Sequence, residues 1–360
     1  MFSPIRITEH RGDDDLLTAG LGLQGLRALV PPAFAEAAHP TPSELRRRAI
    51  WSNWRGIADL APGGGYGELY GSTAAVPGRE FSAYARLPGA TQPHRVLVQL
   101  PDDFDARKRC VVVTASSGSR GIYGAIAVAG AWGLPRGCAV AYTDKGAGTD
   151  YFDLDAGQGI ALDGTVAAAG GDAALAFAPA PASGHGVAFK HAHSQDNPEA
   201  DWGRHLKQAA QFALSVLDAQ FPQQAPFTFA NTRVIAVGIS NAGGAVLRAA
   251  EDPEPWLDAA VAGEPSVLVD GHGARALYDY ASEAALLMPC ALPQLGIPAM
   301  PGLEAKCAAL AARGVISGAT FDAQQKDALA RLRAAGWSDA GLRAGAISVG
   351  FDLWRAIAVA

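Results

Sequence analysis

Ser240 stands where a serine can act as a nucleophile. An apolar run at residues 234–237 predicts a buried strand and residues 242–251 predict a helix, so Ser240 falls at the turn between them, after Gly238 and before Ala242. Such a turn lifts the serine hydroxyl above the sheet edge, where free N–H groups at the helix start face a developing oxyanion. The spacing is Gly-x-Ser-x-Ala, which adds a methyl group where strand and helix nearly touch. The alternative is a serine that only caps the helix.

A second oxyanion donor is expected from the loop after the third strand of the predicted sheet. That loop, residues 115–121, consists mostly of small residues that let a substrate approach the backbone. We take Ser117 and Gly118 as candidates there, beside the N–H group of Asn241 directly after the nucleophile. A plain polar turn is the alternative.

The candidates for binding the rest of a substrate are two cations and one histidine. Arg120 and Lys145 follow the third and fourth predicted strands, so either can attract a substrate carboxylate; ordinary surface charge is the alternative. His272 is the only histidine beyond Ser240, but it comes too early for a triad in which acid and histidine follow later strands. A serine without a base is a weak nucleophile. Either an unusual base serves or the chain ends before the triad is complete, and we expect the second.

The elements around these residues alternate between strands and helices. A hairpin comes first, and buried strands separated by helices follow; the six predicted strands are 81–87, 95–100, 110–114, 138–142, 234–237 and 257–261. This order predicts an α/β class, α/β-hydrolase-like, with a mainly parallel sheet. The six predicted strands correspond to strands one to six of the α/β-hydrolase order, and the last strands of that order are missing from the prediction.

Three parts are expected along the chain. Residues 1–80 read as irregular or helical, with a helix that starts at the capping box Thr41–Glu44. Residues 81–270 form the core with the nucleophile turn, and within them residues 143–193 read as a long loop. Residues 271–360 read as a helical, lid-like region because no strand alternates with their helices.

Composition excludes several classes of protein. The 360 residues are 49% hydrophobic and 18% charged, which excludes disorder as the main state. The net charge of -6 and the lack of a basic block argue against nucleic-acid binding. The longest apolar run, residues 123–132, is too short to span a membrane, and residues 1–11 show no secretory signal. The expected partner is a small-molecule ester, without nucleic acid or membrane.

Cysteines and histidines give no metal pattern. The spacing of the four cysteines does not match a zinc site; they are Cys110, Cys138, Cys290 and Cys307. The first two are interpreted as small buried thiols beside apolar runs. The cysteines therefore do not indicate whether the protein works in an oxidising or a reducing compartment. The His-x-His pair in residues 191–193 has no third ligand at a convincing offset. We expect neither a metal nor another cofactor.

Four segments resemble a known family, the D-(−)-3-hydroxybutyrate oligomer hydrolases. They are residues 14–22, 64–67, 191–198 and 238–251, and the similarity covers nearly the whole chain after the first dozen residues. The resemblance implies an esterase that cuts short 3-hydroxybutyrate oligomers, including the dimer, to monomers, with its nucleophile at Ser240. Family members usually have glycine in place of Ala242 and are much longer at the C-terminus. Some carry an export signal, which leaves a secreted or periplasmic location open.

Two alternatives remain. Tannase and feruloyl-esterase relatives resemble this chain in the nucleophile turn and a large lid, but they typically have cysteine just before the nucleophile, where this chain has Ile239. The second alternative is a catalytically incomplete fragment that folds and binds oligomers without turnover.

Overall fold

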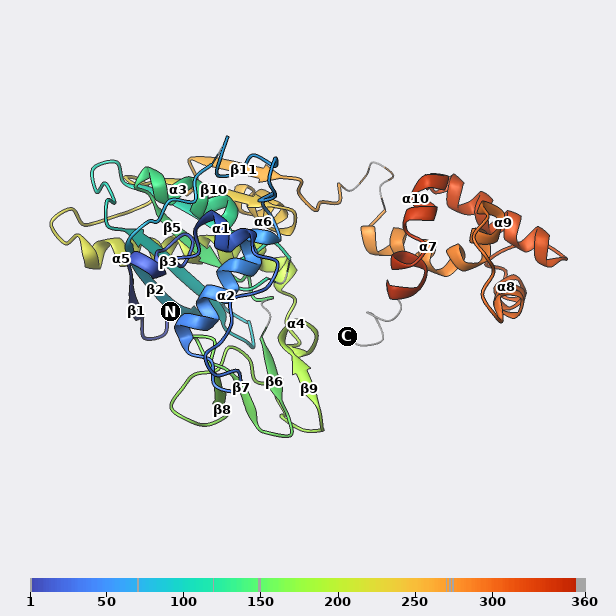
Figure 1. Ribbon diagram of the computed structural model, residues 1–360, viewed down its shortest axis with the longest axis horizontal. Helices are drawn as coiled ribbons and strands as arrows, with labels where there is room; N and C mark the ends of the chain where they lie inside the picture. The colour runs from blue at the N-terminus through green and yellow to red at the C-terminus, as the bar shows by residue number, and fades with distance from the viewer. Residues whose placement is uncertain are drawn as a thin grey trace. The chain divides into compact units, whose positions relative to one another are not determined.

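The chain forms two compact units, Met1–Ser266 and Val267–Ala360. The computed structural model describes residues 2–69, 71–118, 120–147, 150–269, 271, 273 and 275–353. Both sheets belong to the N-terminal unit, and the described part of the C-terminal unit is built from helices (Figure 1). The predicted three-part division stays a prediction.

The main sheet has seven strands in the order β1-β2-β3-β5-β4-β10-β11. The pairings from β1 to β5 are antiparallel, and those from β5 through β4 and β10 to β11 are parallel. The strands are β1 (Arg6–His10), β2 (Gly78–Ala85), β3 (His94–Pro101), β4 (Cys110–Ala115), β5 (Ala139–Thr143), β10 (Arg233–Ile239) and β11 (Ala259–Gly263).

A second sheet of four strands, in the order β8-β7-β6-β9, is antiparallel throughout. Its strands are three residues each: β6 (Tyr151–Asp153), β7 (Gln158–Ile160), β8 (Val166–Ala168) and β9 (Val187–Phe189). Phe152 and Phe177 are its largest buried side chains. This sheet lies within residues 143–193, which the sequence analysis read as a loop.

The predicted fold class is therefore wrong. The described chain has a mixed seven-stranded sheet and a separate antiparallel sheet, which is not the mainly parallel α/β-hydrolase layout. The first hairpin was predicted and is the antiparallel pair β2–β3, but β1 and the second sheet were missed because their strands are short. They are rich in charged or small residues and do not alternate clearly between apolar and polar positions.

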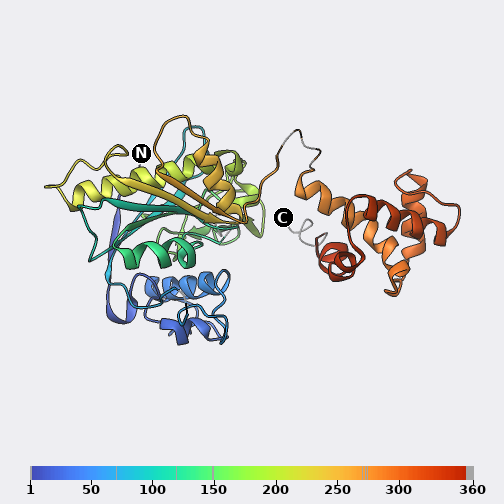
Figure 2. The ribbon, with the colours of Figure 1, turned by 90° about the horizontal axis from the view of Figure 1, so that it is seen from above.

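Both faces of the main sheet are covered by helices (Figure 2). Val111 and Val113 of β4 belong to the core under α5 (Trp202–Gln220) and α6 (Asn241–Ala250), whereas Val112 between them belongs to the opposite core. This alternation is expected of a strand buried on both faces. The opposite face carries α1 (Gly22–Arg27), α2 (Pro42–Arg55), the π-helical η2 (Ile126–Gly130) and α3 (Ala131–Gly133).

The shorter helices of this unit connect the layers. They are η1 (Gly12–Asp14), η3 (Leu134–Arg136), α4 (Lys190–His193) and η4 (Pro198–Asp201). The capping box predicted at the start of α2 is confirmed, since the Thr41 side chain accepts from the N–H of Glu44 and the Glu44 carboxylate accepts from the N–H of Thr41.

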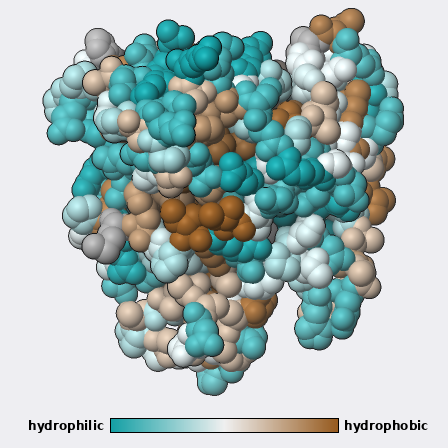
Figure 3. All heavy atoms as spheres, turned by 90° about the vertical axis from the view of Figure 1, so that its left-hand side faces the viewer, coloured by the Kyte–Doolittle hydropathy of each residue, from teal (hydrophilic) through white to brown (hydrophobic). Residues whose placement is uncertain are grey.

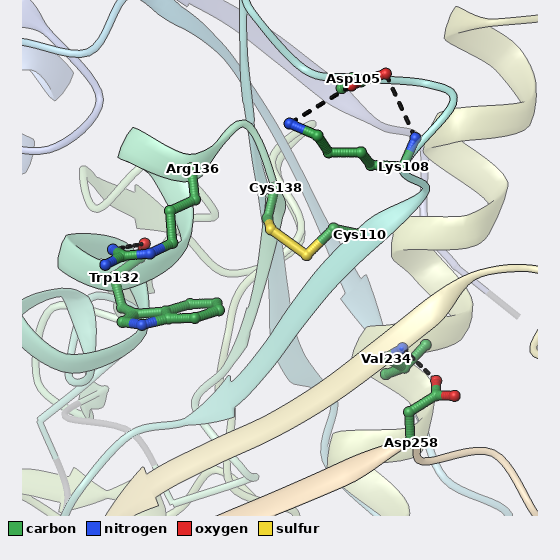
Figure 4. Close-up of a disulfide and its surroundings, with 8 residues drawn as sticks. All are labelled: Asp105, Lys108, Cys110, Trp132, Arg136, Cys138, Val234 and Asp258. Atoms are coloured by element: carbon green, nitrogen blue, oxygen red, sulfur yellow. Dashed lines mark hydrogen bonds and ion pairs between the residues drawn. A yellow bond between two sulfur atoms is a disulfide. The ribbon is translucent and has the colours of Figure 1, made fainter.

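A disulfide joins Cys110 and Cys138 at the edge opposite the predicted nucleophile (Figure 4). The parallel register pairs Val111 with Ala139, so the two cysteines are level at the starts of β4 and β5, with Cα atoms 4.8 Å apart. Reading them as free thiols was wrong, because the sequence did not show that these two strands are neighbours.

The C-terminal unit packs its helices around a core of its own. They are α7 (Leu277–Ala291), η5 (Leu292–Leu295), α8 (Leu303–Ala312), α9 (Phe321–Ala334), α10 (Asp339–Ala344) and the π-helical η6 (Ser348–Asp352). A disulfide between Cys290 and Cys307 ties α7 to α8. The role of this unit as a lid stays a prediction.

The face shown in Figure 3 is mostly hydrophilic, with apolar atoms gathered in small patches. No helix in the described ranges combines the length and apolar character that a membrane crossing needs.

Candidate active site

Ser240 forms the turn between β10 and α6, and its backbone has a conformation that residues other than glycine rarely adopt. Its φ is 57° and its ψ is -124°. Its N–H donates to the carbonyl of Gly263 on β11 at 2.9 Å, and its carbonyl accepts from the N–H of Gly244 at 3.0 Å. Such strain persists only where the surrounding structure holds it, and it is concentrated at functional sites.

Small residues allow this turn. A Cβ atom on Gly238 would stand 2.4 Å from the carbonyl oxygen of Ala242, and one on Gly243 would stand 2.8 Å from that of Gly263. Strand and helix therefore approach more closely here than any larger residue permits. Ala242 itself is fully buried, and its methyl group is accommodated.

The loop after β4 comes to the same edge of the sheet. Ala236 of β10 pairs in parallel with Val113 of β4, so the neighbouring strands end at the same edge, where Ser240 follows β10 and Ser117 lies two residues after β4. Ser117 is buried, and Gly118 has a φ of 56° with open space around its Cβ position. The predicted oxyanion loop and the predicted nucleophile thus follow the ends of two neighbouring strands.

Lys145 joins this loop to the end of the next strand. Ala115 pairs with Thr143 at the ends of β4 and β5, and Ser117 and Lys145 each lie two residues beyond these ends. The Lys145 ammonium is 1% exposed and donates to the carbonyl of Gly118 at 2.6 Å. Burial lowers the pKa of Lys145 from 10.5 to about 8, although nearby carboxylates oppose the shift. Lys145 therefore holds the loop, and its predicted contact with substrate stays untested.

Buried charges anchor the segment that carries Lys145. Asp144 accepts from the N–H of Arg95 at 3.0 Å, and the Arg95 guanidinium pairs with Asp150 at 2.8 Å. Lys190, fully buried at the start of α4, has its ammonium 3.8 Å from Asp144 and 3.9 Å from Asp150. Two carboxylates thus balance two buried cations. Without these partners, the buried cations would destabilise the folded protein. No sequence pattern indicated this cluster.

Arg120 is the exposed cation of this edge. Its guanidinium lies against Gly56, where a Cβ atom would overlap it, and donates to the Gly56 carbonyl at 3.0 Å. His272, the third predicted substrate-binding residue, lies outside the described residues.

Asn241 is the first residue of α6, so its N–H lacks an acceptor within the helix. Its side-chain oxygen lies 3.5 Å from the Ser240 hydroxyl. Among the described residues no histidine or carboxylate bonds to that hydroxyl. The part of the chain that the structure describes thus places the predicted nucleophile next to one predicted oxyanion donor, with no base bonded to its hydroxyl.

The histidines of residues 191–193 do not form a metal site. His191 pairs with Glu199 at 3.0 Å, and His193 bonds to the backbone of Phe189. No group of three potential ligands is found among the described residues.

Glu264 was missed by the sequence analysis. Ile239 pairs with Gly263, so Ser240 and Glu264 directly follow the ends of the neighbouring strands β10 and β11. Glu264 has a φ of 44° and is exposed. The signal was a charged residue directly after an apolar strand of the parallel part of the sheet, where functional side chains gather.

A cavity of about 470 Å³ opens beside the loop after β4. Its wall includes Arg120 and Ile122 from that loop and Asp150 from the segment after β5, together with residues of β1, β2, β3 and α2. This volume lies in the range that holds small ligands. Ser240 is not part of its wall.

The chain is similar throughout to one family. The model of the family described as 3HB-oligomer hydrolase matches residues 1–360, and the chain belongs to this family. A protein of Burkholderia ambifaria named D-(-)-3-hydroxybutyrate oligomer hydrolase is 42% identical, and one of Burkholderia vietnamiensis with the same name is 41% identical. Each match covers 92% of this chain and 56% of the relative, so the chain spans little more than half the length of these relatives.

Proposed function

We propose that this chain carries the nucleophile and the oxyanion-binding elements of an ester hydrolase that cleaves 3-hydroxybutyrate oligomers. The observation that carries the proposal is the strained Ser240, which follows β10 at the same sheet edge where the Ser117 loop follows the neighbouring β4, in a chain of this family. The names of the relatives supply the substrate class, which is a short chain of hydroxy acids joined by esters.

The reaction follows from the positions of the donors. The Ser240 oxygen attacks an ester carbonyl, and the N–H groups of Asn241 and of Ser117 or Gly118 stabilise the negative charge on its oxygen. One such donor contributes about 3 kcal/mol of transition-state stabilisation. The hydroxyl proton of Ser240 ends on the departing alcohol, and water then releases the hydroxy acid from the serine ester. Lys145 fixes the carbonyl of Gly118 and with it the direction of the loop.

A second function, binding without turnover, is favoured by one observation. No described residue is positioned to take the Ser240 proton. The tannase-like alternative has less support, because all four cysteines are paired elsewhere and Ile239 precedes the nucleophile.

The test combines covalent labelling with turnover. The chain is treated with a fluorophosphonate and, separately, with the 3-hydroxybutyrate dimer. We expect labelling at Ser240 and release of monomer, both abolished in Ser240→Ala. Ser282→Ala, which removes an exposed hydroxyl on α7, is the matched control and should behave as the wild type. Labelling without turnover would favour the binding function. Undiminished hydrolysis by Ser240→Ala would refute the assignment of the nucleophile.

A further inference from the structure

Glu264 is held against the nucleophile turn by the backbone on both sides of it. The Ser240 N–H donates to the carbonyl of Gly263 at 2.9 Å, and the N–H of Ser266 donates to the Ser240 carbonyl at 3.3 Å. The segment between these bonds contains only Glu264 and Pro265. Helix α6 also packs closely against this segment, because a Cβ atom on Gly243 would lie 2.8 Å from the carbonyl oxygen of Gly263. The backbone of Glu264 is thus held beside Ser240 on its β11 side, with its side chain exposed.

The opposite side of Ser240 is cationic. In the order β5-β4-β10-β11, Lys145 follows β5, Arg120 follows β4, Ser240 follows β10 and Glu264 follows β11. Lys145 is buried, so the exposed Arg120 is the cation that a ligand can reach. Charge therefore changes sign along the sheet edge, with the nucleophile between the two ends.

The cavity continues from the cationic side. Two buried arginines of its wall, Arg46 and Arg95, are already paired with Glu80 and Asp150 at 2.8 Å. Arg120, in contrast, forms no ion pair with a described carboxylate and donates to a backbone carbonyl. Apolar side chains also line the space, among them Leu45, Ile122 and Leu162. Arg6 of β1 also lines the space, as do the carboxylates of Glu9 and Asp163. Arg120 is the arginine of the wall that follows a parallel strand of this sheet edge, so a short apolar chain that enters from the edge can bring its carboxylate to Arg120.

We propose that the site reads the direction of a hydroxy-acid oligomer, with Glu264 accepting the free hydroxyl of the acyl end and Arg120 binding the carboxylate of the other end in the cavity. The proposal rests on the proposed function. A 3-hydroxybutyrate oligomer has one free hydroxyl and one carboxylate, at opposite ends of a chain that carries apolar methyl groups. The scissile ester then lies between the two ends, over Ser240. Glu264 and Arg120 would be substrate-binding residues that set specificity.

Binding measured without turnover tests the proposal. Calorimetry on Ser240→Ala gives dissociation constants for three ligands: the 3-hydroxybutyrate dimer, its methyl ester, which lacks the carboxylate, and 3-butyryloxybutyrate, which lacks the hydroxyl. Glu264→Ala and Arg120→Ala are added singly. Glu251→Ala, directly after the last residue of α6, and Arg107→Ala, before the start of β4, are the matched controls at exposed positions of the same unit.

Each variant should weaken the binding of the ligands that carry the group it contacts and spare the ligand that lacks this group. Glu264→Ala should weaken dimer binding about 10-fold and leave 3-butyryloxybutyrate within 2-fold, because a charge-assisted bond to the hydroxyl is lost. Arg120→Ala should weaken the dimer about 10-fold and leave the methyl ester within 2-fold. Equal losses for all ligands, or none, would overturn the directional reading. Failure of the proposed function would appear separately, as hydrolysis that survives in Ser240→Ala.

Discussion

Gly238→Ala tests whether the close approach of β10 and α6 holds Ser240 in its reactive position. The added Cβ would lie 2.4 Å from the carbonyl oxygen and 2.9 Å from the Cβ of Ala242, both buried. Ordinary contact begins near 3.4 Å, so strand and helix must separate by about 1 Å. Overpacking of this size costs about 1–3 kcal/mol. A displacement of about 1 Å at a reacting group costs about 100-fold in rate.

The assay is the rate of fluorophosphonate labelling of Ser240, together with the free energy of unfolding in urea. We expect Gly238→Ala to fold, to lose about 2 kcal/mol of stability, and to label about 100-fold more slowly than the wild type. Gly263→Ala is the matched control on the neighbouring strand, because its Cβ would meet the nearest atom at 3.7 Å, an ordinary contact. A folded Gly238→Ala protein that labels at the wild-type rate would refute the argument that this turn geometry creates the nucleophile.

Three further predictions concern stability. Folding lowers the pKa of Lys145 from 10.5 to about 8, so between these pH values the unfolded chain holds a proton that the folded chain has lost. The free energy of unfolding should therefore rise with pH across that window, by about 3 kcal/mol relative to Lys145→Gln. Urea titrations at each pH measure the difference in stability between the two proteins, and a difference that does not change with pH would contradict the reasoning. Glu80→Gln removes one of the two carboxylates that pair with the buried Arg46, and Asp14 remains at 2.8 Å, so the free energy of unfolding in urea at pH 7 should fall by about 3 kcal/mol, the low end for a broken buried pair; a loss below about 1 kcal/mol would show that the pair is dispensable. Replacing both Cys290 and Cys307 by alanine opens a loop closed across 17 residues and should destabilise the C-terminal unit by about 3 kcal/mol, and an unchanged urea midpoint under oxidising conditions would contradict this.

Local patterns predicted the elements that depend on nearby residues. The capping box of Thr41 and Glu44 fixes the start of α2 because both partners lie within one turn of helix. The turn at Ser240 was equally visible, since a strand, a glycine and a helix start adjoin in the sequence. The assignment of Ser240 as nucleophile, and of Ser117 and Gly118 as oxyanion donors, still awaits experiment.

Contacts between distant segments were beyond local patterns. The antiparallel additions to the sheet escaped prediction because β1 joins β2 across more than sixty residues, and its side chains Arg6 and Glu9 carry no strand signal. Cys110 and Cys138 read as thiols until their strands proved to be neighbours.

The sequence alone determined which residue types stand at strand ends, because chain order and short-range sterics decide where a strand gives way to a helix. Tertiary structure alone decided which strand ends meet. It placed Glu264 on one side of Ser240 and Arg120 on the other, and it closed the buried cluster around Lys190. The physical reason is that strand order depends on how two faces of a sheet bury apolar side chains, an energy shared among segments far apart in the chain.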